Sequence, residues 1–407
     1  MKKILTLTIL IFYASSIFAQ IVSLNQGRIQ QKHYFQEIPY QEIKGNLIVQ
    51  VSINEKNYNF IFDTGAPLVI SDKLYKELHL RSSRHINAND AAGERKQMRS
   101  ILLPEIHLQG ITFRNIPGLV LNEDSKWSKC YGIDGIDGII GSNMLRNSVV
   151  QFDEQNKQII ITDNIKKLAL QTNAYQKMRL QPSASNPYIE ITLQKGADKT
   201  TINNVLFDSG DGSDIFTLSL HELKLVDRIV DTIAESEGSF AFSGAHEIYK
   251  KQKYLLLNIP ELIMHNITFN DVTVTTTYAH SSRIGVKLIQ YGKTTLDYKK
   301  RRFYFEPFDN INTNQPTENQ WAIYPTFQND KWVVGIIWDK QLESQVNLGD
   351  EVLSINGIDT QSMSFCEFFM LEIPSGDKRV LELRDIHTGE IKKVEVERLQ
   401  VNKDKEN

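Results

Sequence analysis

The chain contains an internal repeat, and this repeat restricts the possible folds more than any other feature of the sequence. Residues 47–71 read LIVQVSINEKNYNFIFDTGAPLVIS, and residues 188–219 read YIEITLQKGADKTTINNVLFDSGDGSDIFTLS. Each segment has an alternating apolar run, a polar turn, a second apolar run and then Asp-Thr-Gly or Asp-Ser-Gly. We therefore expect both segments to form the same strand–turn–strand unit.

Two further pairs of segments match in the same order, so the repeat has the size of a domain, about 145 residues. In the second pair, Gly141 aligns with Gly285 without a gap. Both copies consist of short β-branched runs broken by Gly, Asn and Asp, which indicates an all-β fold with one short helix at 72–80. The matching segments are 103–116 with 259–272, and 139–161 with 283–305.

The pattern changes after residue 308. Residues 309–320 are polar and aperiodic and read as a linker. Residues 321–400 form a separate small α+β unit, for which the sequence predicts three strands and one helix. These elements are strands at 332–338, 379–383 and 391–396, and a helix at 364–371.

The N-terminus has the pattern of a secretory signal. Lys2 and Lys3 precede an apolar run at 4–13, and small residues follow before Gln20. We expect residues 1–19 to be a signal peptide and the mature protein to be exported, to the periplasm or outside the cell. A buried N-terminal helix is the alternative. No later segment has the roughly 20 apolar residues that a transmembrane helix needs.

Composition excludes several classes of function. The net charge of −3, with no Lys/Arg-rich block, argues against nucleic-acid binding. The nine histidines show no metal-binding spacing, so we expect neither metal nor cofactor. Cys130 and Cys366 fall in different segments, and we favour two free thiols. We expect a monomer.

The chemistry of the repeat lies in its two aspartates. Asp63 and Asp208 each follow an apolar run, where an unpaired buried carboxylate is costly. If the two repeats bring them together, they can share a proton, because two close carboxylates do not both ionise. The ionised member can accept a proton from water while the protonated member polarises a carbonyl.

FIFDTGA and VLFDSG resemble the active-site loops of aspartic proteases of the retropepsin and pepsin type. The segments DGIIGSNML (137–145) and RIGVKLI (283–289) are similar to the hydrophobic-hydrophobic-Gly element of that family. The resemblance covers about residues 40–308. It implies two β-barrel-like lobes related by a pseudo-two-fold axis in one duplicated chain, with boundaries at 38–165 and 166–308.

The resemblance also implies roles for residues. Asp63 and Asp208 would be the catalytic pair, and the substrate would be a peptide or protein. A β-hairpin flap would cover it, either 86–97 with its tip at Ala92-Gly93 or 238–249. A plain surface hairpin is the alternative for both. The supporting residues of the two loops would be Thr64, Gly65, Ser209 and Gly210.

The second loop departs from the family pattern because it continues with two further acids, Asp211 and Asp214. A carboxylate beside the pair would raise the pKa values of the pair further. The alternative is that these side chains point to solvent.

The C-terminal unit resembles a PDZ domain. LGDEVLSINGIDT (348–360) is similar to the turn-strand-turn of that family. The resemblance implies binding of extended chain ends by strand addition, with residues 321–324 as the candidate carboxylate loop. This unit would recruit substrate. The alternative is that it packs on the second lobe and stabilises it.

Two functions from different classes follow. The first is an exported aspartic endopeptidase in which an Asp63/Asp208 pair activates water. The second is a non-catalytic peptide-binding or scaffold protein that keeps the fold after the Asp-Ser-Gly lobe has lost its function. Carboxylates within hydrogen-bond reach favour the first hypothesis, and diverging loops favour the second.

Overall fold

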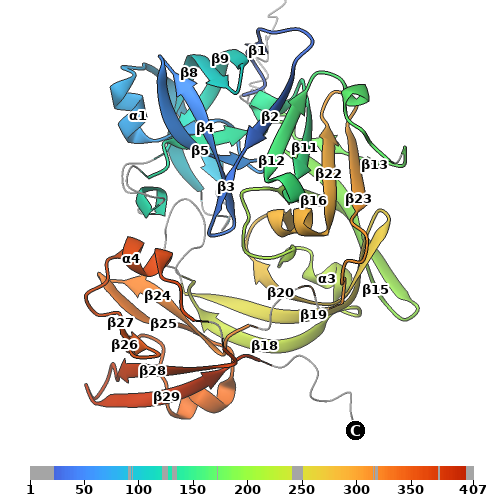
Figure 1. The fold of residues 1–407 in the computed structure, drawn as a ribbon. Helices are drawn as coiled ribbons and strands as arrows, with labels where there is room; N and C mark the ends of the chain where they lie inside the picture. The colour runs from blue at the N-terminus through green and yellow to red at the C-terminus, as the bar shows by residue number, and fades with distance from the viewer. Residues whose placement is uncertain are drawn as a thin grey trace, which may run out of the picture.

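The structure is a computed structural model, and the chain in it is mainly β, as the sequence predicts (Figure 1). The predicted signal peptide at 1–19 lies outside the described residues. Among the residues that are described, no helix combines the length and hydropathy that a membrane span requires. The described residues are 23–89, 93, 95–121, 127–130, 135–171, 173–240, 251–314, 316, 320–374 and 376–399.

The first lobe is a nine-stranded sheet that closes on itself, because its β9 pairs with β8 as well as with β6. The apolar side of these strands fills the interior of the lobe. The strands, in spatial order, are β1 (Arg28–Ile29), β9 (Ile111–Val120), β6 (Val69–Ile70), β10 (Gly138–Gly141), β5 (Lys56–Asp63), β4 (Asn46–Ile53), β8 (Arg95–Leu108) and β7 (Ser82–Asn89), with β3 (Gln41–Ile43) paired to β4.

The second lobe is an eight-stranded sheet, closed in the same way by a pairing of β15 with β19. Both closed sheets agree with the predicted β-barrel-like lobes. The strands, in spatial order, are β14 (Arg179–Leu180), β15 (Pro187–Lys195), β16 (Asp198–Asp208), β21 (Arg283–Gly285), β17 (Phe216–Ser219), β20 (Ile267–Thr277), β19 (Gln252–Met264) and β18 (Asp231–Gly238).

The two lobes repeat the same strand pairings around the aspartates. The strand that ends at each aspartate pairs in parallel with a short strand that ends at a glycine. Gly141 of β10 lies opposite Asp63 of β5, and Gly285 of β21 lies opposite Asp208 of β16. The segments that match in sequence therefore occupy matching places in the sheets. That the repeat arose by duplication stays a prediction.

A third sheet of six strands joins the lobes, with β11 of the first lobe paired to β22 of the second. One continuous apolar core extends through both lobes. In it, the ring centroid of Phe152 of β11 lies 5.8 Å from that of Phe62 and 5.7 Å from that of Phe207. The lobes are thus fixed to each other. The strands are β13 (Gln176–Lys177), β23 (Arg302–Pro307), β22 (Gly292–Asp297), β11 (Val149–Asp153), β12 (Gln158–Thr162) and β2 (Phe35–Pro39).

The helices are short. The predicted helix at 72–80 begins where expected, because the Ser71 hydroxyl accepts a hydrogen bond from the Leu74 N–H, but it ends at residue 77. The α-helices are α1 (Asp72–Glu77), α2 (Ser142–Leu145), α3 (Leu223–Val226) and α4 (Phe365–Met370). The 3₁₀ helices are η1 (Trp127–Cys130), η2 (Glu154–Asn156), η3 (Ile165–Lys167), η4 (Val286–Tyr291) and η5 (Lys340–Ser344).

The C-terminal domain has its own sheet and core. The predicted helix is present as α4, and its first turn is closed by a capping box between Ser364 and Glu367. Trp332 stacks on Phe368 of this helix with the ring centroids 3.7 Å apart. The strands are β24 (Ile323–Gln328), β25 (Lys331–Ile337), β26 (Glu351–Ile355), β28 (Lys378–Arg384) and β29 (Ile391–Glu397), with β27 (Ile358–Asp359) paired to β26.

The expectation of two free thiols is wrong, because Cys130 and Cys366 form a disulfide across a sequence separation of 236 residues. The sequence did not indicate this pairing, because the two cysteines lie in segments far apart along the chain. The fold brings η1 of the first lobe against α4, which lies on the side of the C-terminal domain that faces that lobe (Figure 1). Beside the disulfide, Lys44 Nζ donates to the Leu371 carbonyl at 3.1 Å.

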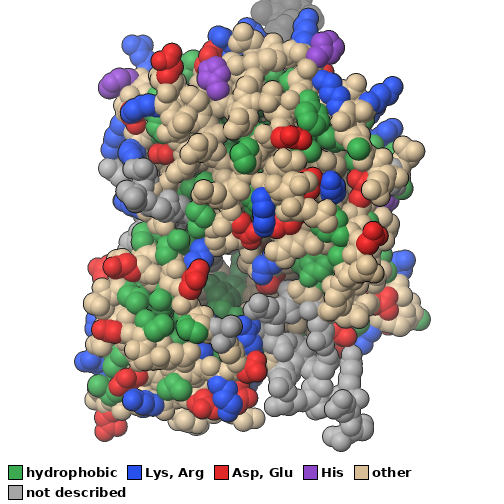
Figure 2. Space-filling view, viewed as in Figure 1, with side chains coloured by type: hydrophobic (Ala, Val, Ile, Leu, Met, Phe, Trp, Pro, Cys, Tyr) green, Lys and Arg blue, Asp and Glu red, His purple; other side chains and the backbone are tan. Residues whose placement is uncertain are grey.

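The C-terminal domain also packs on the second lobe. Ser239 N, just after β18, donates to the Gly335 carbonyl of β25 at 3.0 Å, and Ile336 and Trp338 are buried in an apolar cluster with Tyr254. The described part of the predicted linker at 309–320 is anchored as well, since the Thr313 carbonyl accepts a hydrogen bond from Asn270 N at 2.9 Å. Figure 2 shows a hollow where the C-terminal domain and the lobes meet, with charged side chains at its rim.

The first prediction concerns the disulfide. Replacing both cysteines, Cys130→Ala with Cys366→Ala, should lower stability by about 2–4 kcal/mol, because a cross-link over a long loop restricts the unfolded chain. Thermal unfolding measures the effect. A reductant should lower the Tm of the wild type and leave the double variant unchanged. A Tm of the untreated double variant equal to that of the wild type would contradict the prediction.

Candidate active site

The structure brings Asp63 and Asp208 together. Asp63 is the last residue of β5 and Asp208 the last residue of β16, and their carboxyl groups are hydrogen-bonded to each other. Asp208 is buried, with 7% of its surface exposed, and Asp63 is partly exposed. The loops converge, so the geometry meets the condition that favours the enzyme hypothesis.

Each carboxylate is oriented by its own loop. Gly65 N donates to Asp63 Oδ1 at 2.6 Å, and Gly210 N donates to Asp208 Oδ1 at 3.0 Å. Both contacts are local turns in which the side chain accepts from the backbone two residues later. The remaining carboxylate oxygens can therefore face each other.

The hydroxyls of Thr64 and Ser209 lock the two loops together. Thr64 Oγ1 donates to the Phe207 carbonyl at 2.6 Å and accepts from Ser209 N at 3.0 Å. Ser209 Oγ donates to the Phe62 carbonyl at 2.8 Å and accepts from Thr64 N at 3.0 Å. Both side chains are fully buried. Losing either hydroxyl would leave buried backbone groups unpaired, at about 1–3 kcal/mol each.

The two glycines allow the carboxylates to approach. A Cβ atom on Gly65 would lie 2.5 Å from Asp208 Cγ, and one on Gly210 would lie 2.4 Å from Asp63 Cγ. Neither position can carry a side chain without pushing the opposite carboxylate away. All six residues that the sequence singles out in the two loops thus meet at one place.

The surroundings make the two carboxyls unequal. Burial raises the pKa of Asp63, and the charge of Asp208 and the hydrogen bond to it raise this pKa well above the ordinary value. Burial also raises the pKa of Asp208, but the guanidinium of Arg283 lowers it, while Asp211 raises it. Both pKa values are raised, so the pair can keep one proton between its members, and the guanidinium of Arg283 favours Asp208 as the ionised member.

Sequence reasoning missed Arg283, which is 6% exposed at the start of β21. Its Nη1 lies 3.8 Å from Asp208 Oδ2, and its Nε lies 3.6 Å from Asp211 Oδ2. The signal was present in the repeat, because Arg283 occupies a position of the hydrophobic-hydrophobic-Gly element. Asp211 and Asp214, the two acids that follow the second loop, are not fully solvated. Asp211 faces Arg283, and Asp214 Oδ1 lies 3.9 Å from Lys287 Nζ.

Three more supporting residues were missed. Ser142 Oγ donates to the Thr64 carbonyl at 2.7 Å and is hydrogen-bonded to the Tyr298 hydroxyl at 2.9 Å. Asn186 Nδ2 donates to the Gly65 carbonyl from the second lobe. These contacts fix the backbone of the first loop. Ser142 directly follows Gly141 of the hydrophobic-hydrophobic-Gly element, but nothing in the sequence marks these contacts, because each one joins residues more than 70 positions apart.

One flap candidate is a β-hairpin that extends toward the second lobe. β7 and β8 pair up to Asn89 and Arg95. Ala92 lies outside the described residues. Gly93 has a φ of +84°, and a Cβ atom there would lie 2.6 Å from the Tyr278 carbonyl. In the second candidate, β18 and β19 pair up to residues 238 and 252, and the tip lies outside the described residues.

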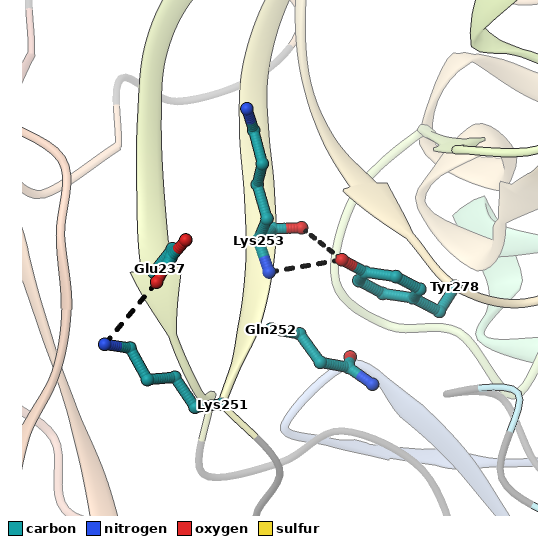
Figure 3. A pocket seen from close by; sticks show the side chains of 5 residues that line it. All are labelled: Glu237, Lys251, Gln252, Lys253 and Tyr278. Carbon is teal, nitrogen blue, oxygen red and sulfur yellow. Dashed lines mark hydrogen bonds and ion pairs between the residues drawn. The ribbon is translucent and has the colours of Figure 1, made fainter.

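A cavity of about 340 Å³ opens at the ends of β18 and β19 (Figure 3). Tyr278 at its wall donates to the Lys253 carbonyl at 2.9 Å and accepts from Lys253 N at 3.1 Å. The aspartate pair does not line this cavity. Its lining residues are Glu237, Lys251, Gln252, Lys253 and Tyr278.

The second prediction tests the close approach of the loops. Gly65→Ala and Gly210→Ala should each abolish activity and lower the Tm, because the new methyl group overlaps the opposite carboxylate. Gly376→Ala is the control, since a Cβ atom there meets only the Lys378 carbonyl at 3.6 Å. Peptide cleavage and thermal unfolding measure both effects. Retained activity in either loop variant would contradict the proposed approach.

Part of the first lobe is similar to a family of known proteins. Residues 49–144 match a protein-family model described as aspartyl protease, a range that contains Asp63 and Gly141. No curated protein sequence matches the chain. Among solved structures, the crystal structure of a retropepsin-like aspartic protease from Rickettsia conorii aligns with 32% of this chain and 94% of that one, at 16% identity and a TM-score of 0.24. The first lobe is therefore similar in sequence to an aspartyl protease domain.

Proposed function

We propose that this chain is an exported aspartic endopeptidase. The observation that carries the proposal is the hydrogen-bonded pair of Asp63 and Asp208, presented by equivalent loops of two lobes. The match of residues 49–144 to an aspartyl protease family supports the reaction class.

The reaction follows from the unequal protonation of the pair. Ionised Asp208 accepts a proton from a water molecule between the carboxyls, and the resulting hydroxide attacks the peptide carbonyl carbon. Protonated Asp63 donates its proton to the carbonyl oxygen, forming a neutral tetrahedral intermediate. When the C–N bond breaks, Asp208 returns its proton to the leaving amine, and Asp63 recovers a proton from the collapsing hydroxyl.

The hairpin of β7 and β8 is proposed as the flap over the substrate. Its described tip residue Gly93 lies against the Tyr278 carbonyl, so the hairpin reaches across to the second lobe. An extended peptide held below it would place a scissile bond over the two carboxyls.

The C-terminal domain is proposed to recruit protein substrates as a PDZ-like module by strand addition. Its contacts with both lobes support a fixed position beside them. The same contacts give it a structural role, because removing it would expose the apolar cluster around Trp338 and break the disulfide.

Export is supported by two features. The basic and apolar N-terminal pattern is that of a signal peptide. The Cys130–Cys366 disulfide is of the kind that persists in oxidising compartments such as the periplasm or the extracellular space.

The third prediction tests the pair. Asp63→Asn and Asp208→Asn should each reduce peptide hydrolysis by at least ~10³-fold, because an amide keeps the shape but cannot share the proton. Asp214→Asn, in the same loop but paired with Lys287, is the matched control and should stay active. Cleavage of an unfolded protein by the purified mature chain is the assay. A metal chelator should not change the rate, because both proton-transfer groups are side chains.

Full activity in either pair variant would exclude this mechanism. If the wild type binds peptides but cleaves none at any pH, the chain is instead a peptide-binding or scaffold protein that keeps the protease fold.

The fourth prediction concerns stability and pH. The pKa of Asp63 is above its ordinary value of 3.8, so the folded protein holds this proton more tightly than the unfolded chain. The stabilisation from the proton is complete below the unfolded pKa and is lost as the pH rises through the folded pKa. The Asp63→Asn variant has no carboxyl at this position, so it does not lose this stabilisation as the pH rises. The Tm of this variant relative to the wild type should therefore rise from about pH 4 to pH 8.

Asp163→Asn is the control of opposite sign. Burial raises the pKa of Asp163, but the hydrogen bond and charge of Lys167 lower it by more. The stabilisation from ionised Asp163 is present above the unfolded pKa and is lost as the pH falls. The relative Tm of this variant should therefore fall as the pH rises from about 2 to about 5 and then stay constant up to pH 8. Parallel trends in the two variants would contradict the assignment of the proton to Asp63.

A further inference from the structure

The two lobes differ at one pair of equivalent positions beside the aspartates. In the first lobe, Ile139 of β10 lies opposite Ile61, two residues before Asp63. In the second lobe, Arg283 of β21 lies opposite Leu206, two residues before Asp208. The sheet register therefore makes Ile139 and Arg283 equivalent.

The residue that follows the loop glycine also differs between the two lobes. The first lobe has Ala66 where the second has Asp211. Ile139 and Ala66 belong to an apolar cluster, whereas Arg283 Nε lies 3.6 Å from Asp211 Oδ2. One lobe thus has an apolar pair at the positions where the other has an ion pair.

The fold does not require this ion pair. Taking two charges out of water is costly, and the side chains of Arg283 and Asp211 are only 7% and 12% exposed. The first lobe forms the same strand pairings with uncharged side chains. A role in the chemistry of the adjacent carboxylate, 3.8 Å from the guanidinium, accounts for the difference between the lobes.

We propose that Arg283 is a positioning residue that, balanced by Asp211, keeps Asp208 the ionised member of the pair and leaves the proton on Asp63. This inference rests on the proposed function and deepens it. The surroundings of the two carboxyls are then asymmetric, because the second lobe has Arg283 where the first lobe has Ile139.

Four groups face Asp208 from the elements packed around it. Asp63 comes from β5, Arg283 from β21 and Asp211 from the second loop. Tyr188 comes from β15, and its phenol is affected by the charge of Asp208. An opposite charge within 4–6 Å lowers the pKa of a carboxyl by about 1–3 units, and Asp211 offsets part of this effect.

The experiment removes the two charges singly and together. Arg283→Ile should move the pH profile of kcat/KM upward by about 1 pH unit, because Asp208 loses its cation and keeps Asp211. Asp211→Asn should move the profile downward. The double variant Arg283→Ile with Asp211→Ala has the residue types of the first lobe at both positions. Its pH profile should lie between those of the wild type and Arg283→Ile. Arg283→Lys retains the charge and should lie near the wild type.

A second readout does not depend on activity. The carboxyl carbons of Asp63 and Asp208 are followed by NMR against pH in ¹³C-aspartate-labelled protein and assigned with the Asp→Asn variants. The pH at which the Asp208 carboxyl titrates should follow the same order among the variants as the pH profiles of kcat/KM. If the order holds but the wild type cleaves no peptide, the proposed function fails and the inference about Asp208 stands.

Two results would overturn the inference. The first is a fall in kcat with unmoved pH profiles and titrations, which would mean that Arg283 serves only the packing of β21. The second covers the case in which Arg283→Ile does not fold. Asp211→Asn must still move the Asp208 titration to lower pH, and no movement there would show that the ion pair does not act on the aspartates.

Discussion

The hydrogen bonds that cross between Thr64 and Ser209 hold the site together. Each hydroxyl binds a backbone carbonyl and a backbone N–H of the other loop, so both loops must be in place before either is satisfied. An unpaired buried polar group is costly, so this interlock makes the lobes one unit. The close approach of the carboxylates, the raised pKa values and the need for glycine all follow from it.

The interlock is symmetric, but the electrostatics around it are not. The backbone contacts of Thr64 and Ser209 correspond one to one, whereas Arg283 and Asp211 have no charged counterparts in the first lobe. A pair with identical surroundings would place its shared proton equally on both members. Different side chains at equivalent positions thus give the two carboxyls different surroundings while the fold stays repeated.

The C-terminal domain adds a second connection between the lobes. The disulfide and the Lys44 contact attach it to the first lobe, and the cluster around Trp338 attaches it to the second. The polar segment at 309–320 suggests a loose tether, yet its described residues are anchored on the second lobe. The attachment comes from apolar surfaces and a covalent bond that lie far from this segment in sequence.

The sequence by itself determined the β lobes, the two loops and the six loop residues, because strand periodicity and the Asp-Thr/Ser-Gly repeat are local patterns that recur. Only the tertiary structure decided what lies beside them. Arg283 lies beside Asp208 because parallel pairing of β16 and β21 places them together, and Cys130 meets Cys366 because η1 packs on α4. Contacts between residues distant in sequence depend on how the chain packs, and no local pattern records them.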